Sequence, residues 1–182
     1  MVATDDDKRR IVQSQNGDHG AFEALIREHQ RMIHSLCYRM SGSLADAEDL
    51  AQETFIHAYQ HLAGFRADAR FSSWLYRIAV NQCLNWQKRK QRLERLHQQW
   101  GEQAQERSTD DPGQAQQIQD ALLQLPPKQR AAVILTTYDG LTHAEAAAAL
   151  GCSETTISWR VFAARSKLKR LLKDQFKPEV GR

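Results

Sequence analysis

The chain has 182 residues, of which 41% are hydrophobic and 26% charged, a composition typical of soluble globular proteins. Its low content of 4 prolines and 9 glycines favours helices over a turn-rich all-β fold. The formal net charge is only +3. The cations are nevertheless clustered, and local potential governs attraction to phosphate, so nucleic acid is a candidate partner.

The start of the chain and its cysteines indicate a cytoplasmic protein. Residues 1–10 are hydrophilic and have no signal-peptide pattern. Cys37, Cys83 and Cys152 lie far apart and form no C-x-x-C pair, so reduced thiols are expected. Because no apolar run approaches the ~20 residues that cross a bilayer, we expect no direct membrane insertion.

Helical spacing of apolar residues predicts three core helices in the first half of the chain, at about 21–40, 44–63 and 74–95. Ser43, followed three residues later by Asp46, is typical of the N-terminus of the second helix. Ser72 or Ser73 can cap the third.

Residues 97–117 are rich in Gln, Glu and Asp, which predicts a flexible linker. Beyond it, periodicity, prolines and glycines predict further helices at about 118–125, 127–138, 143–150 and 154–173. Thr142 and Glu145 form a capping box, and Ser153 caps the last helix. The expected fold is all-α, with two small helical domains at residues 11–96 and 118–177.

Residues 141–172 predict a helix-turn-helix, because a short capped helix is followed by a tight turn at Gly151 and a longer basic helix. No acidic residue occurs between Ile157 and Lys173, so the second helix suits the phosphates of a major groove. A solvated basic face on a helical hairpin is the alternative interpretation. The cations are Arg160, Arg165, Lys167, Lys169, Arg170 and Lys173.

The predicted helix at 74–95 combines two features that single-stranded DNA binding requires, cations along one side and aromatic rings near its start. The alternative is that the rings belong to the core, since Trp and Phe are most often buried. The polar row is Arg77, Asn81, Asn85, Lys88 and Arg92. The rings are Phe65, Phe71, Trp74 and Tyr76.

Asp46, Asp49 and Glu53 form an acidic stripe at helical spacing, with Gln52 and Ile56 beside it. Within a net-basic protein, such a partly apolar acidic stripe suits a protein partner better than DNA. A plain solvated helix face remains the alternative.

These segments, in this order, resemble the bacterial sigma-70 family, specifically its extracytoplasmic-function (ECF) sigma factors. The resemblance rests on DAEDLAQETF at 46–55, FR at 65–66, FSSWLYRIAVN at 71–81, and LPP at 125–127 followed by the helix-turn-helix. It implies region 2 at 11–96 and region 4 at 118–177, without the intermediate domain of larger sigma factors. It also implies a transcription initiation factor that is not an enzyme and needs neither cofactor nor metal.

The resemblance further implies three partners: core RNA polymerase, promoter DNA and an anti-sigma factor, which in this family is often anchored in the membrane. The residues implied for docking on the clamp helices of polymerase are Asp46, Asp49, Gln52, Glu53 and Ile56. Those implied for the −10 element are Phe65, Arg66, Asp68, Phe71, Ser72, Trp74, Tyr76, Arg77, Asn81, Asn85 and Lys88. Those implied for the −35 element are Ser153, Thr155, Thr156, Ser158, Trp159, Arg160, Phe162, Arg165 and Lys167.

The chain departs from the family pattern in its last helix. Ser158 and Trp159 stand where relatives often have a basic and then a small residue, and Ala163 stands where some have a basic residue. Arginine reads guanine through two hydrogen bonds, whereas serine makes one less selective contact. We therefore expect base preference at one −35 position to be flattened.

Two other classes of protein are weighed against this interpretation. A helix-turn-helix regulator that is not a polymerase subunit would need neither the acidic stripe nor the aromatic-basic helix. A metal protein could use His57 with His61, or His34 with Cys37, but neither pair has an obvious further ligand set. No nucleophile elbow, phosphate loop or paired catalytic carboxylate occurs.

Overall fold

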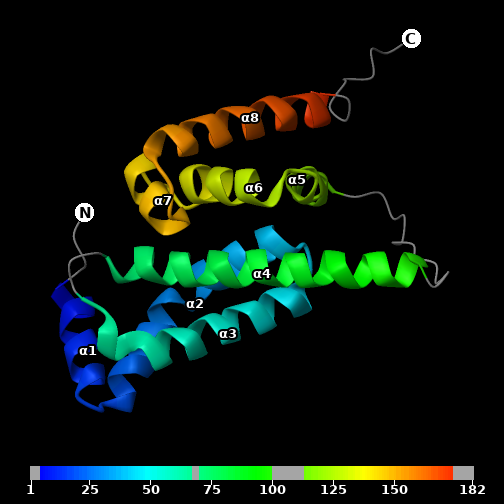
Figure 1. The fold of residues 1–182 in the computed structure, drawn as a ribbon. Helices are drawn as coiled ribbons and strands as arrows, with labels where there is room; N and C mark the ends of the chain where they lie inside the picture. Colours follow the sequence, from blue (N-terminus) through cyan, green and yellow to red (C-terminus); the bar gives the residue numbers. More distant parts are fainter. Residues whose placement is uncertain (1–4, 67–69, 100–112, 174–182) are drawn as a thin grey trace, which may run out of the picture.

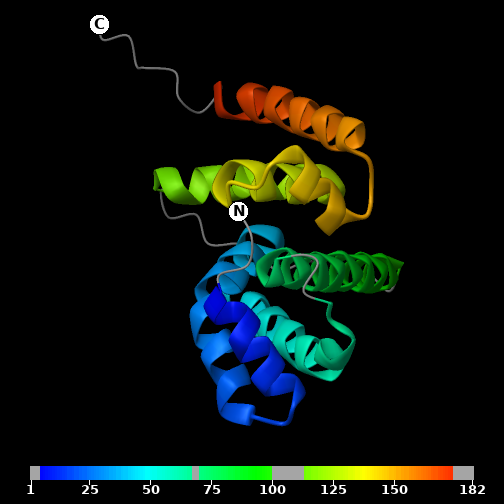
Figure 2. The same cartoon turned by 90° about the vertical axis from the view of Figure 1, so that its left-hand side faces the viewer.

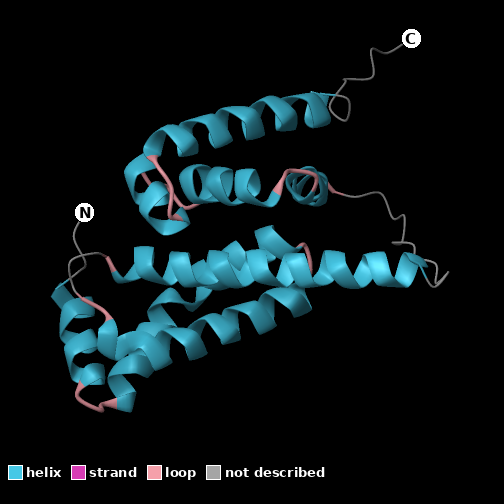
Figure 3. Cartoon of the chain, viewed as in Figure 1, coloured by secondary structure: helices cyan, strands magenta, loops and turns pink. Residues whose placement is uncertain are grey.

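The computed structural model describes residues 5–66, 70–99 and 113–173, and within these residues every regular element is a helix (Figures 1 and 3). The expected all-α fold is therefore confirmed. No helix in the described ranges is long and apolar enough to cross a membrane.

The first unit contains α1 (Asp5–Gln15), α2 (His19–Ser41), α3 (Leu44–His61), a short 3₁₀ turn η1 (Leu62–Gly64) and α4 (Phe71–Gln99). Ser43 accepts a hydrogen bond from the Asp46 backbone N–H, so the predicted cap of α3 is confirmed. Gly42 ends α2 with a positive φ of 78°, a conformation that favours glycine.

The second unit contains α5 (Gln114–Leu123), α6 (Pro127–Val133), a π-helical turn η2 (Ile134–Tyr138), α7 (His143–Leu150) and α8 (Glu154–Lys173). The capping box between Thr142 and Glu145 is confirmed, and Gly151 closes α7 with φ 59°. This places α7 and α8 as the two helices of the predicted helix-turn-helix.

The helix bounds differ from the prediction at several places, and α4 also runs on to Gln99, inside the predicted linker 97–117. α1 was not predicted, because its burial depends on contacts with α2 rather than on local periodicity; Ile11 is 3% exposed. α4 begins at Phe71 instead of after Ser72 or Ser73, and α5 begins at Gln114, inside the predicted linker. The glutamines that begin α5 carry no apolar signal. The predicted linker residues 100–112, and Asp68, lie outside the described residues.

The two units pack against each other, with α7 on α4 and α5 beside the end of α2 (Figures 1 and 2). Arg130 is 2% exposed and joins them. Its guanidinium donates to the carbonyls of Met40 at 2.6 Å and Leu123 at 2.6 Å. Burial lowers the pKa of Arg130 to about 10, so the side chain stays charged at neutral pH. Gln119 Nε2 also donates to the Tyr38 carbonyl at 3.1 Å.

Contacts at the surface complete this arrangement. The Arg39 guanidinium lies 4.5 Å from the centre of the Tyr138 ring, and Arg70 forms an ion pair with Glu145 at 3.2 Å. The hydrogen bonds from Thr142, with a smaller contribution from Arg70, lower the pKa of Glu145. The C-terminal end of α2 is thus held by side chains of the second unit.

Candidate functional site

An open, mostly apolar groove of about 980 Å³ lies between α2 and α3. Leu44 and Ile56 of α3 line it although they are 66% and 50% exposed. Large apolar side chains gathered in one hollow are typical of a surface that binds another molecule. The large apolar side chains that line it are Phe22, Ile26, Tyr38, Leu44, Phe55, Ile56 and Tyr59.

The predicted docking residues are divided between the groove and its edge. Gln52 and Ile56 line the groove. Asp49 and Glu53 are exposed, one helical turn apart on α3, and do not line it. Asp46 is half-buried in the first turn of α3. The acidic stripe therefore borders an apolar surface.

The α2 side of the groove was not predicted. It supplies Arg31, His34 and the half-buried Ile26, which periodicity assigned to the core. Glu48 of α3 also lines the groove and was missed. Helical spacing indicates which residues of α2 share an apolar face. It does not indicate that this face joins α3 to form a groove, because the pairing of two helices is a long-range contact.

Aromatic rings pack closely where the chain enters α4. The ring centroids of Phe65 and Trp74 are 4.9 Å apart, and those of Phe71 and Trp74 are 5.6 Å apart. Phe65, Phe71 and Tyr76 are 9%, 1% and 4% exposed, so their interpretation as core residues is confirmed. Burial, together with the charge of Asp139, raises the pKa of the Tyr76 hydroxyl. Trp74 is half-buried and keeps part of its ring at the surface.

The segment before α4 is fixed from α1. Gln15 Nε2 donates to the carbonyls of Leu62 at 2.9 Å and Phe65 at 3.0 Å. Arg66, the next residue, is exposed. The backbone is therefore anchored to α1 as far as Phe65.

The polar row predicted on the third core helix lies on the surface of α4. Arg77, Asn81, Asn85 and Lys88 are exposed at spacings of three and four, which places them on one side of the helix. Ser72 is half-buried at its start. Cations on either side of two amides can hold a phosphate backbone while the amides donate to bases.

The N-terminal half of α8 presents an exposed surface that the helix-turn-helix positions. The Ser153 hydroxyl accepts from the Thr156 N–H at 3.2 Å, which confirms the predicted cap, and buried Ile157 holds α8 against the core. Trp159 and Phe162 are 62% and 74% exposed. Both rings therefore point away from the core of the second unit. Thr155 and Arg165 are also exposed.

Three polar residues of α8 already have partners within the protein. Ser158 Oγ donates to the Glu154 carbonyl at 3.0 Å and lies 2.9 Å from His143 Nδ1. Arg160 Nη1 lies 3.3 Å from Cys152 Sγ. Lys167 Nζ donates to the Gln124 carbonyl at 2.7 Å. A nucleic acid would compete with each of these contacts.

The two ligand pairs weighed as metal sites are placed differently. His57 and His61 are exposed on α3 with stacked rings 6.2 Å apart. His34 lines the groove, whereas Cys37 is buried with its Sγ 4.0 Å from that of Cys83. The hydrogen bond from Cys83, together with burial, raises the pKa of the Cys37 thiol.

Comparisons with known proteins agree with this architecture. Residues 25–93 match the family description "Sigma-70 region 2" and residues 115–168 match "Sigma-70, region 4". The ECF RNA polymerase sigma factor SigM of Mycobacterium tuberculosis is 37% identical over 161 residues, which cover 86% of this chain and 79% of SigM. SigW of Bacillus subtilis is 30% identical over 187 residues, covering 92% of this chain and 97% of SigW.

A solved structure shares the fold. The sigma factor RpoE of Bartonella quintana, in complex with the anti-sigma factor NepR, superimposes with a TM-score of 0.69 at 27% sequence identity, covering 84% of this chain and 96% of RpoE. The chain therefore belongs to the sigma-70 family and, within it, to the ECF sigma factors, as the sequence motifs predicted.

Proposed function

We propose that the chain binds core RNA polymerase and directs it to promoters that have −10 and −35 elements. In this proposal α1 to α4 form the docking and −10 unit and α5 to α8 form the −35 unit, with the linker between α4 and α5. The observation that carries this proposal is the apolar groove between α2 and α3, whose α3 side contains Gln52 and the half-exposed Ile56. The chain acts in the cytoplasm as an initiation factor and not as an enzyme.

The groove takes an amphipathic helical element of the polymerase largest subunit. Ile56 and Leu44 provide exposed apolar contact area along α3, and loss of such an apolar anchor can cost a large share of the binding energy. Asp49, Glu53 and Asp46 border this surface and attract basic side chains of the partner. Reversing these charges would place like charges against the partner, which strongly disfavours binding.

The surface of α4 holds the separated strand of the −10 element. Arg77 and Lys88 contact phosphates, while Asn81 and Asn85 donate to base edges. Trp74 offers a partly exposed ring for stacking. Phe65, Phe71 and Tyr76 support this surface from beneath, and Arg66, Asp68 and Ser72 belong to the segment that encloses the extruded base.

The N-terminal half of α8 enters the major groove of the −35 element. Thr155, Ser158, Trp159 and Phe162 lie toward the bases, and Arg165 toward phosphate. Ser153, Thr156, Arg160 and Lys167 contact the backbone.

Promoter binding requires the two units to separate. The elements are about 25 base pairs apart by their names, which is ~85 Å of duplex at about 3.4 Å per base pair. A compact chain of this length has a radius of gyration of only ~16 Å. The packed arrangement of α7 on α4 is therefore a resting state. RpoE of Bartonella quintana forms a complex with the anti-sigma factor NepR, and we propose that an anti-sigma factor holds this chain in the inactive, packed form.

Binding to purified core polymerase tests the docking groove. Ile56→Asp places a charge in the apolar groove and should weaken core binding by about 100-fold, the cost of about 3 kcal/mol that loss of an interface anchor produces. Leu93→Asp is the matched control, because Leu93 is 54% exposed on α4 and does not line the groove. Equal core affinity of the two variants would contradict the docking assignment.

Transcription with the same proteins separates this proposal from a helix-turn-helix regulator. A sigma factor confers specific initiation on bare core enzyme, whereas a regulator leaves core enzyme inactive on promoter DNA.

A further inference from the structure

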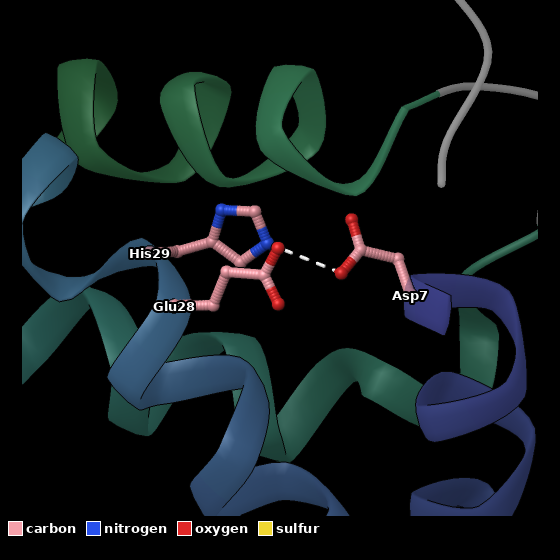
Figure 4. A group of neighbouring side chains, drawn as sticks. All are labelled: Asp7, Glu28 and His29. Atoms are coloured by element: carbon pink, nitrogen blue, oxygen red, sulfur yellow. Dashed lines mark ion pairs between the residues drawn. The ribbon is translucent and has the colours of Figure 1, made fainter. Parts of the chain in front are cut away.

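Side chains with metal-ligating atoms meet where α1 lies on α2, away from the surfaces described above. Asp7 comes from α1, and Glu28 and His29 come from α2 (Figure 4). Asp7 and His29 are 6% and 8% exposed, whereas Glu28 is exposed. One ligand atom from each lies within 4.8 Å of the other two.

The distance between the two buried side chains suits an intervening ion. His29 Nε2 lies 3.5 Å from Asp7 Oδ1, beyond the ~2.7 to 3.2 Å of an N–H···O hydrogen bond. This nitrogen is buried, makes no hydrogen bond and points at the carboxylate (Figure 4). Two ligands at ~2.05 Å from a tetrahedral zinc ion are about 3.3 Å apart, close to the observed spacing.

The charges also suit a divalent cation. Asp7 and Glu28 supply two carboxylates, and His29 supplies a neutral ligand when its ring is deprotonated. Arg10 donates to the Glu28 carboxylate and so holds it beside the cluster. Imidazole nitrogen combined with carboxylate oxygen is a ligand set that zinc accepts, and water can complete the coordination.

We propose that Asp7, Glu28 and His29 bind one divalent transition-metal ion, Zn²⁺ by ligand chemistry, which joins α1 to α2. His29 also packs on Phe71, with ring centroids 5.4 Å apart, and α1 holds the Phe65 carbonyl through Gln15. The ion therefore stabilises α1 and, through it, the start of α4. The binding site itself does not depend on the proposed function.

Zn²⁺ titration of the full chain, stripped with chelator, tests the site by calorimetry and thermal melting. We expect one ion per chain and a higher melting temperature, because an ion that binds only the folded state stabilises it. His29→Gln and Asp7→Asn should each weaken binding by ~100-fold or more, since loss of a second-shell partner alone costs ~10 to 100-fold. Glu28→Gln, at an exposed position, should fold normally and also weaken binding.

The His57→Gln/His61→Gln double variant is the matched control, since these exposed rings could bind zinc at the surface. It should bind one ion as tightly as the wild type. Tetrahedral Co²⁺ absorption should appear in the wild type and in this control, and not in Glu28→Gln. No binding by the wild type, or binding lost in the control and kept in Glu28→Gln, would overturn the proposal.

Discussion

Replacing Asp139 by asparagine should tighten the packing of the second unit on the first. Asp139 follows η2, and its Oδ2 is buried without a hydrogen bond. Burial raises the pKa of this carboxyl to about 6, although Arg39 of α2 lowers it. Its charge also acts on Tyr76 of α4. The side chain therefore lies between the two units and returns to water when they separate.

The size of the effect follows from the two protonation equilibria. The carboxyl has its ordinary pKa of 3.8 when the units are apart and about 6 when they are packed. Protons therefore favour the packed form. Its stability is highest below about pH 4, falls as pH rises, and has lost the full contribution above about pH 6. The difference is at most about 3 kcal/mol at neutral pH. Solvent screening at this half-buried site reduces it to about 1.5 kcal/mol, or roughly tenfold in the equilibrium.

Energy transfer between dyes on the two units measures this equilibrium. Exposed Gln60 of α3 and Lys169 of α8 can be changed to cysteine for labelling, with Cys152→Ser to limit side reactions. Wild type should open as pH rises from about 4 to about 6 and then level off. Asp139→Asn should stay packed at pH 7.5, with a ratio of packed to open form about tenfold higher than that of the wild type.

Glu48→Gln is the control, because Glu48 is exposed in the α2–α3 groove and should leave the pH response unchanged. An Asp139→Asn variant that keeps the wild-type pH response, or that opens the two units, would contradict this role of the Asp139 carboxyl.

Other substitutions test the cap of α7, the docking edge on α3 and the two proposed DNA-binding surfaces. Thr142→Ala removes the capping box of α7 and should cost ~1 kcal/mol of stability in chemical denaturation, whereas an unchanged midpoint and slope would exclude that role. Reversing charge at exposed Asp49 and Glu53 should abolish core binding in a folded protein, and unchanged affinity would contradict the docking edge. Asn81→Ala should reduce permanganate reactivity of promoter thymines more than duplex binding, and wild-type reactivity would exclude base capture by Asn81. Ser158→Arg should shift the −35 sequences selected from a promoter library, and an unchanged selection would mean that residue 158 does not face the bases.

Local signals in the sequence predicted much of the fold and little of its assembly. The capping box at Thr142, the turn at Gly151 and the cap at Ser153 define the helix-turn-helix by contacts between neighbours in the chain, and all three are confirmed. α1 was missed because Ile11 and Asp7 are buried by α2, a contact that no periodicity within α1 records.

The packing between the units was also beyond sequence reasoning. Nothing in the sequence distinguishes Arg130 from other basic residues, yet its guanidinium donates a hydrogen bond to the Met40 carbonyl in the other unit. The groove is similar, because α2 residues such as His34 join it only when α2 and α3 are paired. By contrast, the position of Ile56 beside Gln52 on α3 was available from helical spacing alone.

Specific initiation by purified core polymerase is the most direct test of whether the chain directs polymerase to promoters. Core enzyme supplied with this chain should produce run-off transcripts from promoters selected in a library, while core enzyme alone should produce none. Ile56→Asp should abolish these transcripts and Leu93→Asp should not, because only Ile56 lines the groove. If the wild-type chain binds the selected DNA but yields no specific transcripts, the proposal that it directs core polymerase to promoters is contradicted.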